Sequence, residues 1–134
     1  MKLYVNGQDI SRITVGSVDT ESLITRQVET ELFLSVIHAF VTERARSYDN
    51  LESIYAVVGP GSATALRCTL SILQTIHFVE GIPLFAVEKN PDEADEATIA
   101  RAIVDAQPVD TLVPLYQHSP RITISNKDVL GRIT

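Results

Sequence analysis

The chain has 134 residues, of which 45% are hydrophobic, so it can bury a substantial core and falls in the size range of one domain. Its formal net charge is -6 and its isoelectric point about 4.9, which argues against a protein that binds nucleic acid on its own, because such binding requires Lys and Arg to neutralise phosphates. The single cysteine, Cys68, cannot form an internal disulfide, and no apolar run is long enough for a membrane span or a signal-peptide core, so we expect a cytoplasmic protein.

The first residues have the pattern of a β-hairpin. We expect strands over residues 3–5 and 10–15, with a turn at Asn6-Gly7, a dipeptide typical of short hairpin turns. The apolar residues at period-two spacing are Leu3, Val5, Ile13 and Val15.

A long helix is expected next, from Asp19-Thr20-Glu21 to about Ser47. Asp19 or Thr20 can cap it, and Glu21 suits the positive end of the helix dipole. Its apolar stripe is wider than contact with one sheet requires, so part of it could face another subunit; a helix packed deeply in the core explains the width equally well. The stripe consists of the rows Leu32-Val36-Phe40 and Phe33-Ile37-Val41.

A Gly-Pro-Gly turn, Gly59 to Gly61, joins an apolar strand to a second helix. Glycines adopt backbone angles closed to other residues, proline fixes one φ angle, and Ser62 is placed to cap the helix. Exposed N–H groups at a helix N-terminus also attract anions, so the turn could hold phosphate; a rigid strand-to-helix corner accounts for the same residues.

The second helix is apolar on more than one side, and Leu66, Leu70, Leu73 and His77 share one face. After a strand at Gly81-Ile82-Pro83-Leu84, a third helix is expected from Asn90 to about Asp105, with Asn90 as cap and Pro91 at its first position. The acidic residues Asp92, Glu93, Asp95 and Glu96 could suggest a divalent cation, but they also complement the helix dipole.

The chain should end with a strand at Pro114-Leu115-Tyr116, a β segment alternating at Ile122 and Ile124, and a polar tail over residues 126–134. The resulting order β, β, α, β, α, β, α, β, β is that of a layered α/β domain. We therefore expect one domain over residues 1–125, followed by the tail.

The sequence contains no recognisable arrangement of catalytic residues. Ser62 is not in a Gly-x-Ser-x-Gly elbow, and the three histidines lack the spacing of a helical zinc site, so we expect no catalytic residue, metal or cofactor. Cys68 is expected to be a small buried hydrophobe. Arg67 could pin the turn or a partner's carboxylate, or be solvated. The histidines are His38 and His77, expected in core or interface packing, and His118, expected in solvent.

The segment from Gly59 to Arg67 resembles the TsaB (YeaZ) family. The family's usual pattern has Phe in place of Ala63 and Gly in place of Ala65, and the other seven of these nine positions match: Gly59, Pro60, Gly61, Ser62, Thr64, Leu66 and Arg67. The resemblance extends from about Leu51 to Val87 and returns at Pro114-Leu115-Tyr116, with Pro120 following.

The resemblance implies a single RNase H-like, actin-like (ASKHA) lobe, a mixed sheet with packed helices. It implies a non-catalytic partner of a TsaD-like enzyme in threonylcarbamoyl modification of tRNA adenosine, with a TsaE-like ATPase as a further partner, a homodimer when alone, tRNA contacted only indirectly and no membrane. In the family the two helices dock against the same pair on TsaD or on a second TsaB. The interface residues so implied are Leu32, Phe33, Val36, Ile37, Phe40, Leu66, Leu70, Leu73 and His77.

Two elements of the family are not recognisable in the sequence. One is an opening strand that ends in an Asp-Thr-Ser-like phosphate turn. The other is the second lobe, since only the helix from Asn90 separates the Leu84 strand from the Pro114 strand. The sequence thus resembles a pared-down member. Two other functions stay open: an enzyme that binds phosphate or nucleotide at Gly59–Ser62, and a self-associating scaffold that has lost the pathway.

Overall fold

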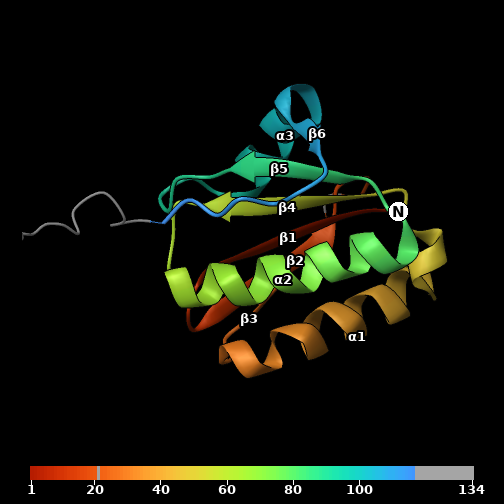
Figure 1. The fold of residues 1–134 in the computed structure, drawn as a ribbon, viewed down its shortest axis with the longest axis horizontal. Coiled ribbons are helices and arrows are strands. Elements are labelled where there is room, and N and C mark those ends of the chain that lie inside the picture. Colours follow the sequence, from red (N-terminus) through yellow and green to blue (C-terminus); the bar gives the residue numbers. More distant parts are fainter. Residues whose placement is uncertain (21, 117–134) are drawn as a thin grey trace, which may run out of the picture.

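A six-stranded mixed sheet forms the centre of the molecule, with two helices on one face and one on the other (Figure 1). The computed structural model describes residues 1–20 and 22–116, so the predictions for Glu21, His118, Pro120, Ile122, Ile124 and residues 126–134 lie outside the described residues. The strands are β1 (Lys2–Asp9), β2 (Arg12–Ser17), β3 (Ser22–Arg26), β4 (Ser53–Gly59), β5 (Leu84–Glu88) and β6 (Gln107–Val109), and the helices are α1 (Phe33–Ala45), α2 (Ala63–Glu80) and α3 (Asp95–Asp105).

The strand order is β3-β2-β1-β4-β5-β6. The first three strands form an antiparallel meander, in which Val5 lies opposite Val15, whereas β1, β4 and β5 run parallel to one another. β6 closes the other edge antiparallel to β5. The predicted α/β class with a mixed sheet is therefore confirmed.

The core has two layers because side chains alternate between the two faces of a strand. The expected period-two set is confirmed: Leu3, Val5, Ile13 and Val15 are all buried on the face that α1 and α2 cover. α3 covers the opposite face with Ile99 and Ala102, against the buried set Tyr4, Tyr55, Val57 and Val87.

The predicted turn at Asn6-Gly7 is wrong, because both residues lie within β1. The strands instead reverse at Ile10 and Ser11, where the Asp9 carboxylate accepts hydrogen bonds from the Ser11 backbone N–H (2.8 Å) and hydroxyl (2.9 Å). Gly7 lies against α2, where a Cβ would lie 2.0 Å from Thr69 Oγ1. Glycine is thus needed here for close packing of a helix on the strand.

The first helix begins later than predicted. Residues 22–26 form the edge strand β3, paired with β2, and the hydroxyl oxygens of Thr14 and Thr25 lie 2.8 Å apart across the two strands. Asp19 does not cap a helix, since its carboxylate accepts the backbone N–H of Lys2 at 3.0 Å. A 3-10 turn at residues 30–32 leads into α1 at Phe33.

The third helix also begins later, at Asp95, after Ala94 and without a side-chain cap. Asn90 is not the cap; its carbonyl oxygen accepts the Glu93 N–H at 2.9 Å in a turn that precedes the helix. Asp95 and Glu96 still occupy the first turn, where negative charge is favourable. The predicted end at Asp105 is confirmed.

The segment at Pro114-Leu115-Tyr116 is extended but forms no ladder of its own among the described residues. The Leu115 N–H donates to Val58 O at 2.8 Å, and Tyr116 makes a single parallel bridge with Gly61.

The opening strand of the fold is present as β1. It lacks only the Asp-Thr-Ser-like sequence motif, because residues 6–8 are Asn-Gly-Gln. Among the described helices, none combines the length and apolar character needed to cross a bilayer.

Candidate functional site at the carboxyl ends of the parallel strands

The three parallel strands end on the same edge of the sheet, at the left of Figure 1. From β4 the chain passes to α2 on one face, and from β5 it passes to α3 on the other. Loops that diverge in this way leave a crevice beyond the strand ends, the usual place for ligands in open α/β sheets. The Gly59–Ser62 turn and the loop from Lys89 to Ala94 form its two sides.

Gly59 and Gly61 serve the turn in different ways. Gly59 has a φ of +130°, and a Cβ there would lie 2.2 Å from Leu115 O. Gly61 does not have positive φ, but a Cβ on it would lie 2.6 Å from both Cβ and the carbonyl oxygen of Gln8. Ser62 caps α2 as predicted, since its Oγ accepts the Ala65 N–H at 3.2 Å.

The backbone groups of the turn are already hydrogen-bonded within the chain. The Gly61 N–H donates to Leu115 O at 3.2 Å, the Ser62 N–H to Gln8 O at 2.9 Å, and Gly59 O accepts the Lys89 N–H at 2.9 Å. Pro60 has no N–H to offer. The amides of Gly61 and Ser62 are therefore not free to hold phosphate, which favours the rigid-corner interpretation.

Gln8 bridges the crevice. Its side-chain amide donates to Pro60 O at 2.8 Å and to Lys89 O at 2.9 Å, and so joins the end of β1 to both loops. The sequence did not single out Gln8, because a polar residue in a strand gives no sign of the carbonyl groups it will meet.

A polar pocket of about 290 Å³ lies beside this bridge, over the sheet face that α3 leaves uncovered. Asn6 and Thr14 line it from the sheet, Lys89 and Asp95 from the loop side, and Arg12 from β2. Among the residues the structure describes, no group of three or more His, Cys, Asp or Glu could hold a metal ion.

The acidic residues of this pocket have partners within the chain. Hydrogen bonds from Ser11 lower the pKa of Asp9, and hydrogen bonds from Arg101, at 2.7 and 3.4 Å, lower the pKa of Glu93. Asp95 accepts the Tyr4 hydroxyl at 2.6 Å and the Asn6 amide at 2.9 Å. Burial, and then the hydrogen bond to Asp95, raises the pKa of Tyr4 far above its usual value.

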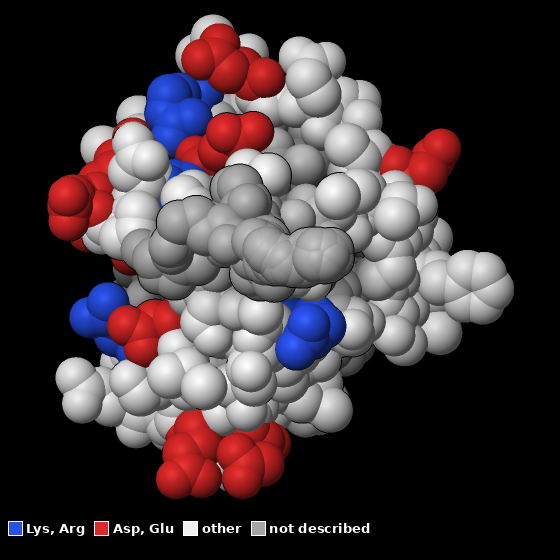
Figure 2. All heavy atoms as spheres, turned by 60° about the vertical axis from the view of Figure 1, so that its left-hand side comes forward, with Lys and Arg blue, Asp and Glu red and all other residues white. Residues whose placement is uncertain are grey.

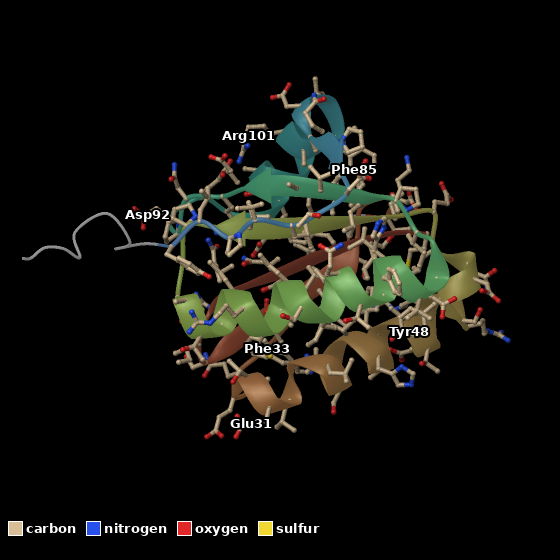
Figure 3. All side chains as sticks on the ribbon, viewed as in Figure 1. Glu31, Phe33, Tyr48, Phe85, Asp92 and Arg101 are labelled. Atoms are coloured by element: carbon tan, nitrogen blue, oxygen red, sulfur yellow. The ribbon has the colours of Figure 1, made fainter. Side chains whose placement is uncertain are left out.

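Lys89 differs from these groups, for it is only 5% exposed and yet none of the ion pairs between described residues includes it. Its ammonium donates to Asn90 O at 3.2 Å. Lys89 also lines a second hollow, of about 640 Å³, whose lining includes Asp92, at the left end of the molecule in Figure 3, and Arg101, beside α3. A lysine directly after an apolar strand was the signal that sequence reasoning missed.

Six of the residues expected at a partner interface are not on the surface, because they are buried inside this one chain. The prediction that they contact a partner is therefore wrong. The two helices pack side by side on the sheet, and this packing takes up most of the wide apolar stripes. Phe33 lies between α1 and α2, whereas Glu31 points outward (Figure 3). The buried six are Phe33, Ile37, Phe40, Leu66, Leu70 and Leu73, and the other three, Leu32, Val36 and His77, keep some exposure.

Three other predicted positions also have defined surroundings. Arg67 is exposed, with its guanidinium 6.0 Å from the centre of the Tyr116 ring. Cys68 is only half-buried and lies 3.4 Å from Thr30 O, so full burial was wrong. His38 is exposed and stacks on Tyr48.

No protein-family model and no curated protein matches this sequence. The structure is similar to "YeaZ from Pseudomonas aeruginosa", with a TM-score of 0.56 and 16% identity over 65% of this chain and 43% of that chain. It is also similar to an "uncharacterized protein with similarity to peptidase YEAZ from Pseudomonas aeruginosa", with a TM-score of 0.52 and 16% identity over 65% and 42%. The chain spans less than half the length of either, and the likeness confirms the expected fold, a single actin-like lobe as in YeaZ.

Proposed function

We propose that this chain is a non-catalytic, TsaB-like assembly subunit that docks on a TsaD-like enzyme and supports threonylcarbamoyl modification of tRNA adenosine. The observation that carries the proposal is the placement of α1 and α2 side by side on one face of a YeaZ-like sheet, with large apolar side chains exposed on both. The Gly59–Arg67 segment, which carries the sequence resemblance, forms the corner and first turn of α2 and so supports the same assignment.

The proposed docking surface consists of the exposed apolar residues of this helical layer. Leu32 and Leu34 are 50% and 52% exposed where α1 begins, and Phe78 and Val79 are 85% and 68% exposed where α2 ends. Val36 lies half-buried in an apolar hollow of about 260 Å³ beside α1. Because α1 and α2 run in the same direction, the two pairs lie at opposite ends of the helical layer (Figure 1), so a partner that covers both must lie along the length of the layer.

The charge of the chain supports indirect contact with tRNA. The formal net charge is -6, and Figure 2 shows acidic and basic side chains interspersed on the end of the molecule that holds the crevice, where the described residues that can be seen form no broad basic patch. Direct binding to tRNA would require such a patch. In the proposed complex, the catalytic subunit and a TsaE-like ATPase supply the contacts with tRNA and nucleotide.

The test is co-expression with the TsaD-like protein of the same genome, followed by co-purification and light scattering. We expect a stable complex with the wild type, no complex with Leu34→Glu, and a normal complex with the control Val104→Glu, an exposed apolar residue of α3 on the opposite face of the sheet. A strict monomer at high concentration that also fails to bind the TsaD-like protein would refute the proposal. A homodimer that ignores that protein would instead support the self-associating scaffold.

A further inference from the structure

We propose that the crevice at the carboxyl ends of β4 and β5 binds the carboxylate group of a small polar organic acid, and that Lys89 is the residue that recognises it. This site is separate from the helical layer proposed to dock a partner, since it lies at the strand ends and opens onto the α3 face. The inference therefore does not depend on the assembly role.

The burial of Lys89 is the first argument. An ammonium removed from water is costly unless a counter-ion or several acceptors replace its hydration. Lys89 is 5% exposed, takes part in no ion pair with the described residues, and uses one of its three donors on Asn90 O. A ligand carboxylate would supply a counter-ion in direct contact, which no described carboxylate of the chain does.

The position of Lys89 is the second argument. It is the first residue after β5, at the point where the chain turns to one face of the sheet while the chain after β4 turns to the other. It lines both the 290 Å³ pocket and the larger hollow beside it. Ligands of open α/β sheets bind at such points.

The other groups of the pocket determine the class of ligand. Asp9 and Glu93 form ion pairs with Arg12 and Arg101, and Asp95 accepts hydrogen bonds from Tyr4 and Asn6, so no described carboxylate is in direct contact with Lys89. The charge of Lys89 still acts on Glu93 and helps to lower its pKa, and the three carboxylates together oppose a doubly charged anion. A monoanionic carboxylate is therefore favoured over a phosphate dianion. Asn6, Gln8 and Thr14 line the same pocket and already bond to Asp95, to the two loop carbonyls and to Thr25. Gln8 Oε1 and the second amide hydrogen of Asn6 have no partner among the described residues and can hydrogen-bond hydroxyl or amide groups of the ligand.

The test titrates the purified chain with sodium acetate, glycolate and L-lactate, and with inorganic phosphate at equal ionic strength. Binding is followed by the shift in melting temperature and by the amide NMR signals of Asn90 and Glu93. Lys89→Met removes the ammonium group proposed to bind the carboxylate, and Lys2→Met, at the end of β1 away from the crevice, is the matched control.

We expect the carboxylates to raise the melting temperature of the wild type and of Lys2→Met saturably, with glycolate and lactate acting at lower concentration than acetate, and Lys89→Met to show no such rise. Without carboxylate, Lys89→Met should melt at or above the wild-type temperature, because it no longer buries an uncompensated charge. The proposal is overturned by an equal response in Lys89→Met, by absent amide shifts in the wild type, by a stronger response to phosphate, or by a Lys89→Met variant that melts well below the wild type.

Discussion

Gly61 lies directly against Gln8: the Gln8 carbonyl oxygen and Cβ would both be 2.6 Å from a Cβ at position 61. The two residues belong to segments far apart in the sequence, and the contact ties the end of β1 to the turn before α2. The requirement for glycine at this position is thus one of space, whereas Gly59 needs both space and positive φ.

We predict that the glycines of the fold differ in how they tolerate alanine. Gly81 has a φ of +71° and open space around it, so Gly81→Ala should cost about 1 kcal/mol from φ alone. Gly59→Ala should cost clearly more, because strain is joined by a clash with Leu115, and Gly61→Ala should cost about 1 kcal/mol or more from the clash alone. Urea unfolding measures all three, and equal costs at Gly59 and Gly81 would contradict the argument.

Replacement of Ser62 by alanine should remove the cap of α2. The lost hydrogen bond to the Ala65 N–H should lower the free energy of unfolding by about 0.5–2 kcal/mol, with an unchanged urea m-value. Thr64→Ala is the control, because Thr64 is exposed in the first turn and is not the capping residue. If Ser62→Ala unfolds like the wild type but no longer binds its partner, the corner is a contact site.

Because of Tyr4, the free energy of unfolding should fall as the pH rises through the alkaline range. Its pKa is raised in the folded state, so the unfolded chain loses the proton first, and the contribution of Tyr4 is complete below about pH 10 and lost as pH rises above it. Tyr4→Phe should therefore unfold more easily at neutral pH, by about 1 kcal/mol for the hydrogen bond to Asp95, but show a shallower loss above pH 10. Urea unfolding of both proteins between pH 8 and 11 tests this, and parallel curves would disprove it.

Neighbouring positions at the start of α1 should behave in opposite ways. Phe33 is fully buried, so Phe33→Ala should cost about 3–5 kcal/mol. Leu34→Ala should change the free energy of unfolding by less than about 0.5 kcal/mol, because its side chain is half-exposed. Thermal melting separates the two, and a large loss at Leu34 would mean that this face is already covered within the chain.

Much of the fold could be predicted because its signals are local. The period-two spacing of Leu3, Val5, Ile13 and Val15 placed them correctly on one face, and Ser62 was recognisable as a cap. β3 was missed because a short edge strand depends on its pairing with β2, and residues 22–26 precede a strongly helical pattern. Helix starts at Phe33 and Asp95 were missed for a related reason: neither has a side-chain cap.

The candidate site was predicted only in part. The turn from Gly59 to Ser62 was identified, but not that its amides are taken up by Leu115 and Gln8, since both partners are distant in sequence. The interface was misjudged because a wide apolar stripe does not reveal whether a neighbouring helix of the same chain fills it, as happens at Phe33 and Leu73. Lys89 could have been found from its place after an apolar strand, although its burial could not.

The sheet order has a consequence for how the chain folds. β1, β2 and β3 follow one another and can pair through short turns, whereas the pairing of β1 with β4 must close a long loop that contains all of α1. Local hairpins form much faster than parallel pairs that span a crossover. We therefore expect the meander to collapse first and the β1–β4 pairing to limit the folding rate, which makes the exposed edge of β1 in the partly folded chain the point most open to intermolecular association.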